Sequence, residues 1–172
     1  MANENQLREE IVRVGRSLFE RGYVHATAGN ISVRLEDGGF LITPTDASLG
    51  HLDPGRLARL DANLQQTGGD RASKTIALHS RIYAAATGVA ATAGTRCVIH
   101  THSTHCVALT LDDAAPGEEL LPPITPYFVM KVGHVPRIAY RRPGAPEAAE
   151  AVAQAIARYG ERGTPIRAVM LE

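Results

Sequence analysis

Two glycine-rich turns divide the early part of the chain into short segments, and they limit what it can fold into. Apolar residues at 31–35 and 40–43 flank the turn Glu-Asp-Gly-Gly at 36–39, which predicts a hairpin of two short strands. A further strand is expected at 57–61, before the turn Thr-Gly-Gly-Asp at 67–70. Strands joined by tight turns are antiparallel, so a strict alternation of strand and helix is excluded.

The remaining segments show helical periodicity or short β-branched runs. Helices are expected at 5–23, 76–86, 105–111 and 147–159, and strands at 97–99 and 168–171. The stretch 112–126 is rich in proline, glycine and acidic residues, and we expect a loop that is too short to link two domains. This mixture predicts one α/β or α+β domain over residues 1–172.

Composition and charge narrow the class of protein. The 172 residues carry 18 Lys and Arg against 18 Asp and Glu, and a zero net charge favours neither nucleic acid nor an anionic membrane as a partner. Five Tyr, three Phe and no Trp disfavour a base-stacking surface. No apolar run reaches the roughly 18 residues of a membrane span, and the polar start is unlike a secretory signal. With two cysteines and no disulfide scaffold, we expect a cytoplasmic protein.

The sharpest chemical signal follows the β-branched run at 97–99. His100 and His102 are two residues apart, so on a strand both imidazoles point to one face. Two neutral imidazoles on one face form half of a metal site, and zinc suits nitrogen ligands. The alternative is a pair of partly buried histidines that form hydrogen bonds at a strand end. His105 adds a third imidazole, which we expect either to support the pair or to be only a polar surface residue.

Three short segments contain the residue types that hold anions. Residues 27–30 (Thr-Ala-Gly-Asn) offer a hydroxyl, a carboxamide and close backbone approach, and residues 43–46 (Thr-Pro-Thr-Asp) offer hydroxyls fixed by a proline. Residues 73–75 (Ser-Lys-Thr) open a helix, where free N–H groups and the positive end of the dipole favour phosphate. The alternatives are plain turns for the first two segments and a helix cap for Ser73.

The order of these motifs along the chain resembles the class II aldolase/adducin superfamily. The residues that carry the resemblance are Thr-Ala-Gly-Asn-Ile-Ser at 27–32, Thr-Pro-Thr at 43–45, Ser-Lys-Thr at 73–75 and His-Thr-His at 100–102. The resemblance implies an α/β fold of one αβα domain, with helices flanking a mostly antiparallel central sheet. It also implies a metal enzyme, with Zn²⁺ as the ion or else Mn or Co, acting on small phosphorylated sugars or sugar acids. The implied assembly is a homotetramer with sites at subunit interfaces.

Further stretches are similar to one branch of the superfamily, the 3-oxo-tetronate 4-phosphate decarboxylases. These stretches lie at 15–19, 52–54, 121–123, 126–130 and 132–136. The branch converts a phosphorylated 3-oxo sugar acid to dihydroxyacetone phosphate and CO2. The alternatives are a sugar-phosphate aldolase or pentulose-phosphate 4-epimerase of the same superfamily, or a non-catalytic adducin-like module.

The resemblance also assigns site residues by position. It makes His100 and His102 the metal ligands, and the expected pocket for the substrate phosphate is lined by Gly29, Asn30, Thr45 and Ser73.

Three further residues receive catalytic roles in the same way. Lys74 is expected to supply a charge for the phosphate or for the departing carboxylate. Tyr127 is expected to reach a neighbouring subunit's site, where it is a candidate proton donor, as are His105 and a metal-bound water. Thr75 stands where the aldolases place an acid/base carboxylate. Retro-aldol cleavage needs such a base and decarboxylation does not, so Thr75 favours the decarboxylase.

A second departure concerns the third metal ligand. The resemblance places it just after the strand expected at 168–171, beyond residue 172, so we expect the C-terminal part of the domain to be missing. A site with two histidines lacks the three protein ligands of catalytic zinc and is expected to bind the ion poorly.

The residues at 124–130 support the predicted assembly from their own chemistry. This run combines aliphatic and aromatic side chains, Met130 and Tyr127, a composition that is favoured in interface cores. The alternative is an interior strand or helix of a single subunit.

Overall fold

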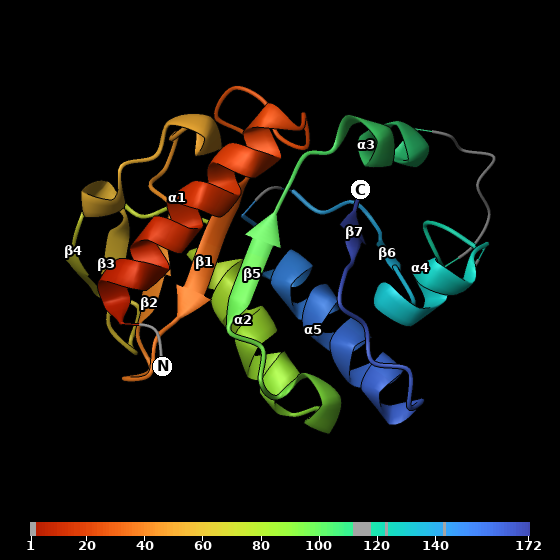
Figure 1. Cartoon of the computed structure of the whole chain (residues 1–172). Helices are drawn as coiled ribbons and strands as arrows, with labels where there is room; N and C mark the ends of the chain where they lie inside the picture. The colour runs from red at the N-terminus through yellow and green to blue at the C-terminus, as the bar shows by residue number, and fades with distance from the viewer. Residues whose placement is uncertain (1–2, 112–117, 123, 143) are drawn as a thin grey trace. The chain divides into compact units, whose positions relative to one another are not determined.

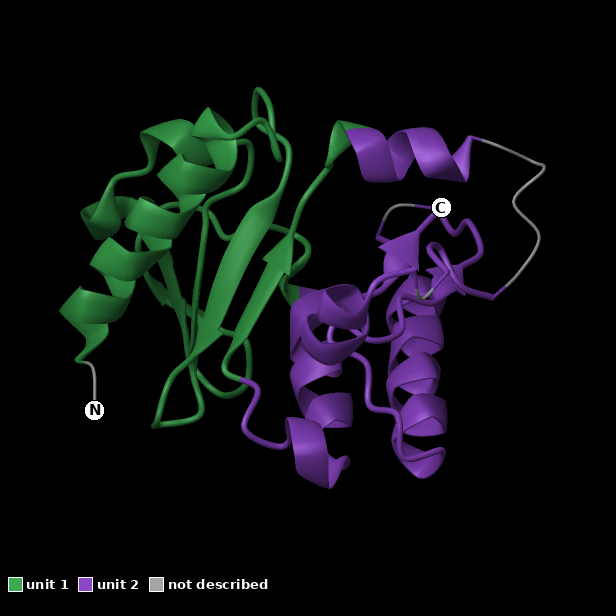
Figure 2. Ribbon diagram, turned by 45° about the vertical axis from the view of Figure 1, so that its right-hand side comes forward, with its two compact units in different colours: residues 1–76, 96–104 green, residues 77–95, 105–172 purple. Residues whose placement is uncertain are grey.

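The computed structural model describes residues 3–111, 118–122, 124–142 and 144–172. The chain forms two compact units, which are residues 1–76 with 96–104, and residues 77–95 with 105–172 (Figure 2). Each unit has its own hydrophobic core and is described by itself. The prediction of one domain over residues 1–172 stays a prediction, and within the loop predicted at 112–126, residues 112–117 and 123 lie outside the described residues.

The first unit contains a five-stranded sheet (Figure 1). Its strands are β1 (Asn30–Arg34), β2 (Phe40–Ile42), β3 (Ala58–Leu60), β4 (Gln66–Gly68) and β5 (Cys97–His100), in the spatial order β4-β3-β2-β1-β5. Every neighbouring pair is antiparallel. The hairpin predicted from the first glycine-rich turn is confirmed as β1 and β2, and the mostly antiparallel central sheet with helices is confirmed as well.

The turn predicted at 67–70 is partly wrong. β4 occupies Gln66–Gly68 and pairs with β3, and the chain bends afterwards at Gly69, with φ at +76°, and Asp70. The strand lies at the edge of the sheet and all three of its residues are exposed. It therefore carries no alternation of apolar and polar residues that a sequence could reveal.

Helix α1 (Glu4–Glu20) packs on the sheet of the first unit. It begins with a capping box, because Asn3 and Gln6 each accept a hydrogen bond from the other's backbone N–H at 2.9 Å. The core that it helps to form includes Leu49 of the short 3₁₀ helix η1 (Leu49–His51), and α1 also contacts the 3₁₀ helix η2 (Pro54–Arg56). The buried residues of this core are Ile11, Val24, Ile31, Leu35, Leu41, Leu49, Leu52 and Leu57.

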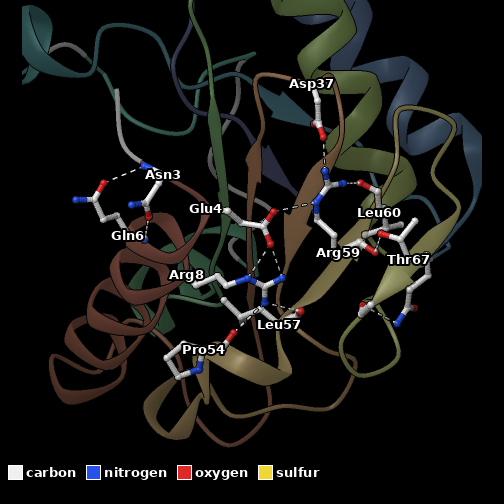
Figure 3. A network of polar contacts seen from close by, with 12 residues as sticks. Asn3, Glu4, Gln6, Arg8, Asp37, Pro54, Leu57, Arg59, Leu60 and Thr67 are labelled. Carbon is white, nitrogen blue, oxygen red and sulfur yellow. Dashed lines mark hydrogen bonds and ion pairs between the residues drawn. The ribbon is translucent and has the colours of Figure 1, made fainter.

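Two arginines connect α1 to strand β3 and to the segment around η2 (Figure 3). Arg59 on β3 pairs with Glu4 at 3.2 Å and with Asp37 in the β1–β2 turn. Arg8 pairs with Glu4 at 2.8 Å and donates to two backbone carbonyls near η2. Both arginine side chains are less than one-fifth exposed, so this network is part of the packing of the first unit.

The second unit is built mainly from helices. Its elements are α2 (Ile76–Thr87), η3 (Ala90–Thr92), α3 (Thr104–Thr110), α4 (Pro126–Lys131), β6 (Arg137–Ile138), α5 (Pro146–Glu161) and β7 (Met170–Leu171), where the first residues of α2 and α3 belong to the first unit. β6 and β7 form a short parallel pair. The core gathers α5 residues such as Val152 and Ile156 with Leu78 and Ile82 of α2. No helix of the described residues is long and apolar enough to cross a lipid bilayer.

Candidate active site

The candidate site lies at one end of the five-stranded sheet. β1 begins at Asn30, β2 ends just before Thr43, and β5 ends at His100. Asn30 is directly opposite His100 in the register of β1 and β5. On the other side of β1, the Ile31 N–H donates to Thr43 Oγ1 at 3.2 Å, and the Thr43 N–H donates to the Ile31 carbonyl at 3.0 Å. Because neighbouring strands run in opposite directions, three of the four predicted motifs meet at this end of the sheet (Figure 1).

The two histidines of the predicted metal site come together. Their ring centroids are 4.8 Å apart and the rings are inclined by 32°. β5 ends at His100, so the alternation of side chains along a strand accounts only for the first histidine, and His102 belongs to the irregular segment that follows. His100 is half-buried and His102 is exposed.

The surroundings of His100 favour its neutral form. Burial lowers the pKa of His100, and the neighbouring His102 imidazole lowers it further. Desolvation disfavours the imidazolium form of His100, and so does the neighbouring ring. A neutral imidazole keeps the lone pair that a metal ion requires.

Asn30 contributes an unsatisfied oxygen beside His100. The residue is 7 % exposed, and its Nδ2 lies 3.4 Å from His100 Nδ1. Its Oδ1 is buried without a hydrogen-bond partner among the described residues. A buried polar atom without a partner is costly, so this oxygen marks a place where a ligand or water would be stabilised.

The donor set fits a divalent ion in part. The paired imidazoles are suitable nitrogen ligands. In the described ranges, no group of three or more His, Cys, Asp or Glu side chains is close enough to hold a metal. Two ligands are therefore present where a catalytic zinc site takes three from protein.

Gly29 is required by the packing at this end of the sheet. Its φ is +83°, and a Cβ at this position would lie 2.7 Å from the His100 carbonyl oxygen and 2.9 Å from Val24 Cγ1. The close backbone approach predicted here is therefore made to β5 within the protein. The predicted contact of Gly29 with substrate stays a prediction.

A β-bridge between two loops brings Thr45 and Ser73 near the same end of the sheet. Pro44 and Ala72 form an isolated antiparallel bridge. The Ser73 N–H donates to the Thr43 carbonyl at 3.3 Å, and the Thr45 N–H donates to the Arg71 carbonyl at 2.9 Å. The fourth predicted motif therefore lies beside the second.

The hydroxyl of Ser73 is held by Thr75. Ser73 is 8 % exposed, and the two hydroxyl oxygens are 2.8 Å apart. The Thr75 N–H lies 3.5 Å from Ser73 Oγ, which is long for a cap, and α2 begins at Ile76. Lys74 between them is exposed. The roles predicted for these three residues stay predictions.

Two residues with predicted or possible roles lie in the second unit. Tyr127 is the second residue of α4, and its side chain is 71 % exposed. His105 is the second residue of α3 and is also exposed. The role assigned to Tyr127 and the choice open for His105 stay predictions.

Sequence reasoning missed one polar cluster of the second unit. Glu119 Oε1 lies 3.1 Å from His134 Nδ1 and accepts a hydrogen bond from the Tyr159 hydroxyl. The signal in the sequence is weak: His134 belongs to the stretch 132–136 that carried the resemblance, but nothing connects it in sequence to Glu119 or Tyr159.

Comparisons with known proteins agree on the family. The family model of the Class II Aldolase and Adducin N-terminal domain matches residues 9–172. A 3-oxo-tetronate 4-phosphate decarboxylase of Cupriavidus necator is 49 % identical over 172 residues, which are 100 % of this chain and 73 % of that protein. A protein of the same name from Escherichia coli K12 is 39 % identical over 88 % of this chain and 68 % of its own length.

Solved structures show the same fold. YgbL of Escherichia coli has a TM-score of 0.81 at 36 % identity, covering 98 % of this chain and 75 % of that chain. The L-fuculose-1-phosphate aldolase of Thermus thermophilus has a TM-score of 0.74 at 29 % identity, covering 96 % and 74 %. With these matches and the site motifs gathered at one end of the sheet, the chain belongs to the class II aldolase and adducin family.

Proposed function

We propose that the chain is a metal-dependent 3-oxo-tetronate 4-phosphate decarboxylase, a carbon–carbon lyase. The observation that carries the proposal is the gathering of the histidine pair and the motifs expected to bind anions at one end of the sheet. The identity of 49 % over the whole chain to a decarboxylase of that name supports the choice of substrate. We place the protein in the cytoplasm.

Enzymes of the class II aldolase type generally depend on a divalent metal, and we propose zinc for this chain. His100 and His102 would hold the ion. The ion would act as a Lewis acid towards the C3 oxo and C2 hydroxyl oxygens of the substrate.

The reaction breaks the bond between C1 and C2 of the substrate. The electron pair of that bond stays on the sugar as an enediolate, CO2 leaves from the ionised carboxylate, and C2 takes up one proton to give dihydroxyacetone phosphate. Tyr127 is the proposed donor of that proton, with His105 as the other candidate among the side chains. Tyr127 is 71 % exposed in the single chain, which leaves it free to meet another subunit.

The phosphate end of the substrate is assigned to the neighbouring loops. Ser73 and Thr45 offer hydroxyl groups, Asn30 offers its carboxamide, and Gly29 offers its backbone N–H group. Lys74 supplies a positive charge for the phosphate or for the departing carboxylate. Ser73 can donate to phosphate while Thr75 donates to Ser73, since either hydroxyl can be the donor in their contact.

Thr75 supports a decarboxylase over an aldolase. Its hydroxyl is a poor base, and it lies 2.8 Å from another hydroxyl with no carboxylate in the contact. A retro-aldol step needs a base that removes a hydroxyl proton, whereas loss of CO2 does not. The same position therefore limits the aldolase alternative more than the decarboxylase.

For the assembly, we propose a homotetramer in which Tyr127 reaches an adjacent subunit's metal site. The exposed side chains on and beside α4 support an interface: Ile124, Tyr127, Val129 and Met130 are 49–73 % exposed. These exposures argue against the alternative of an interior helix of one subunit. Such a cluster of aliphatic, aromatic and Met side chains is typical of an interface core.

The test is to supply each class of substrate and to measure the products. Release of CO2 and dihydroxyacetone phosphate in equal amounts from 3-oxo-tetronate 4-phosphate is the expected result. Aldehyde release from a sugar phosphate would instead identify an aldolase. Protein that carries no zinc, manganese or cobalt after purification in their presence, and that shows no turnover, would identify a non-catalytic module.

A further inference from the structure

In the second unit, the two ends of a short segment of the chain are joined by an isolated β-bridge. Glu119 and Pro136 form an isolated antiparallel bridge. The Leu120 N–H donates to the Val135 carbonyl at 2.8 Å, and the Arg137 N–H donates to the Glu118 carbonyl at 2.8 Å. We call the described residues between them, 120–122 and 124–134, the α4 segment because they contain α4 and Tyr127. Both ends of this segment are therefore fixed at the same place.

The Glu119 carboxylate reinforces this closure with both oxygens. Oε2 accepts a hydrogen bond from the Val135 N–H at 2.9 Å. Oε1 lies 3.1 Å from His134 Nδ1 and also accepts from the Tyr159 hydroxyl. One side chain thus ties the end of the α4 segment, at His134 and Val135, to helix α5.

Tyr159 is a rigid anchor for this tie. It is 3 % exposed and belongs to the core of the second unit. Its ring lies 5.3 Å from the His134 ring, and the Arg158 and Arg162 guanidinium groups lie 5.5 and 5.6 Å from its centroid. Burial and then the hydrogen bond to Glu119 raise the pKa of Tyr159 to about 12, so the phenol remains a hydrogen-bond donor near neutral pH.

The α4 segment has little packing of its own to fix its orientation. α4 is six residues long and contains no buried residue. A further contact is the hydrogen bond from Arg167 Nη1 to the Lys131 carbonyl at 3.3 Å. With no buried residue in α4, the closure at Glu119 is a constraint on where the α4 segment, and with it Tyr127, lies.

We propose that Glu119 is a positioning residue that holds the α4 segment, and with it the Tyr127 hydroxyl, in its working orientation. It does not touch the substrate, and it acts by joining His134 and Val135 to Tyr159. The functional part of this inference rests on the proposed function, in which Tyr127 delivers the proton to C2. The structural part, that Glu119 orders the α4 segment, stands without it.

Glu119→Gln tests the inference with a minimal change of volume. All the groups facing the carboxylate in these contacts, namely the Val135 N–H, the Tyr159 hydroxyl and His134, are hydrogen-bond donors or can act as donors. A glutamine must turn its NH₂ group towards one side of this set and breaks the tie there. Glu118→Gln is the matched control, because Glu118 is an exposed neighbour whose carboxylate lies 3.5 Å from the Arg158 guanidinium, outside the tie.

Hydrogen–deuterium exchange of the full chain gives the first measurement. In Glu119→Gln we expect peptides within 126–134 to exchange at least about 10-fold faster, with α5 peptides unchanged and Glu118→Gln like the parent. Tyr159→Phe keeps the ring in the core and removes one hydrogen-bond donor to Glu119, so exchange of the same peptides should also become faster. This variant replaces Glu119→Gln in the test if Glu119→Gln does not fold. Equal exchange in 126–134 for the Glu119 and Glu118 variants would overturn the proposal.

A double-mutant cycle with Tyr127→Phe tests the functional part. Glu119→Gln should lower kcat about 10-fold with KM changed less than about two-fold, and it should lower kcat no further in a Tyr127→Phe background. An equal loss in both backgrounds would show that Glu119 does not act through Tyr127 and would overturn the positioning role. If Tyr127→Phe alone leaves kcat unchanged, the proposed proton donor is wrong, while the exchange experiment still decides whether Glu119 orders the segment.

Discussion

His100 occupies the last position of β5, opposite Asn30 in the sheet, whereas Tyr127 lies on a six-residue helix with no buried residue. The first is positioned by a backbone ladder that depends little on any one side chain. The second depends on a carboxylate that joins three donors. Substitutions at the end of the sheet should therefore lower metal binding and turnover while the chain stays folded. Substitutions around Glu119 should first loosen the α4 segment.

The largest effect is expected from removing both imidazoles. The double variant His100→Ala, His102→Ala should lose its bound metal and lower turnover by at least about 100-fold. The midpoint of thermal unfolding should change little, because β5 is held by backbone hydrogen bonds to β1. Metal analysis measures the bound ion, calorimetry measures the midpoint, and CO2 release measures turnover. His51→Ala, at an exposed histidine of η1, is the control for metal content and turnover. Unchanged metal content in the double variant would refute the ligand assignment.

Gly29→Ala should produce the next largest effect, and it tests how tightly the end of the sheet is packed. Gly29 and Gly144 share a φ of +83°, but a Cβ at Gly144 would have no atom within 4 Å, whereas one at Gly29 would lie 2.7 Å from the His100 carbonyl oxygen. We expect Gly29→Ala to lower the free energy of unfolding by about 3 kcal/mol, from the strained φ and overpacking together. Gly144→Ala should lower it by about 1 kcal/mol, from the strained φ alone. Urea denaturation measures both, and equal losses would contradict the packing role.

A smaller effect is expected from Ser73→Ala. Loss of one hydrogen bond to a charged phosphate should raise KM about 10-fold for the phosphorylated substrate, with little change in kcat. Ser80→Ala on α2 is the matched control, since its hydroxyl donates within the helix to the Ala77 carbonyl at 2.9 Å. A KM that rises equally for an unphosphorylated substrate would count against the phosphate contact.

The smallest effect is expected at Tyr159, which holds Glu119 in the second unit. Its pKa is about 12 in the folded chain, because of burial and then the Glu119 contact, against about 10 in an unfolded chain. The neutral phenol therefore favours the folded state, and this contribution is complete below pH 10 and is lost as pH rises towards 12. The free energy of unfolding should decline more steeply between pH 10 and 12 in the parent than in Tyr159→Phe. Identical slopes would show that the phenol is not stabilised by its surroundings.

The sequence predicted those parts of the fold that are encoded locally. The first glycine-rich turn located the β1–β2 hairpin, and periodicity located α1, α2, α3 and α5 to within a few residues. The rings of His100 and His102 do lie together, at a centroid distance of 4.8 Å, although His102 follows the end of β5 and strand alternation does not account for its position. In these cases the responsible residues are close neighbours along the chain.

Features that depend on distant residues could not be predicted. Ser73 comes near Thr45 through the bridge between Pro44 and Ala72, and no local pattern encodes that bridge. Glu119 and Tyr159 are 40 residues apart, and each is an ordinary residue in its own segment. β4 was missed because its exposed side chains carry no period, so only backbone pairing defines it.

The pairing of β1 with β5 also dictates an order of folding. Asn30 and His100 are partners across 70 residues, and residues 77–95 between them belong to the second unit. Closing a loop of this length costs entropy before any contact compensates for it, and such pairings form slowly. During synthesis the β1–β2 hairpin and α1 can assemble early, whereas the histidine pair is completed only after residue 102 has emerged from the ribosome. The arrangement of the histidine pair against Asn30 is thus a late product of folding, because it is complete only when the sheet has its fifth strand.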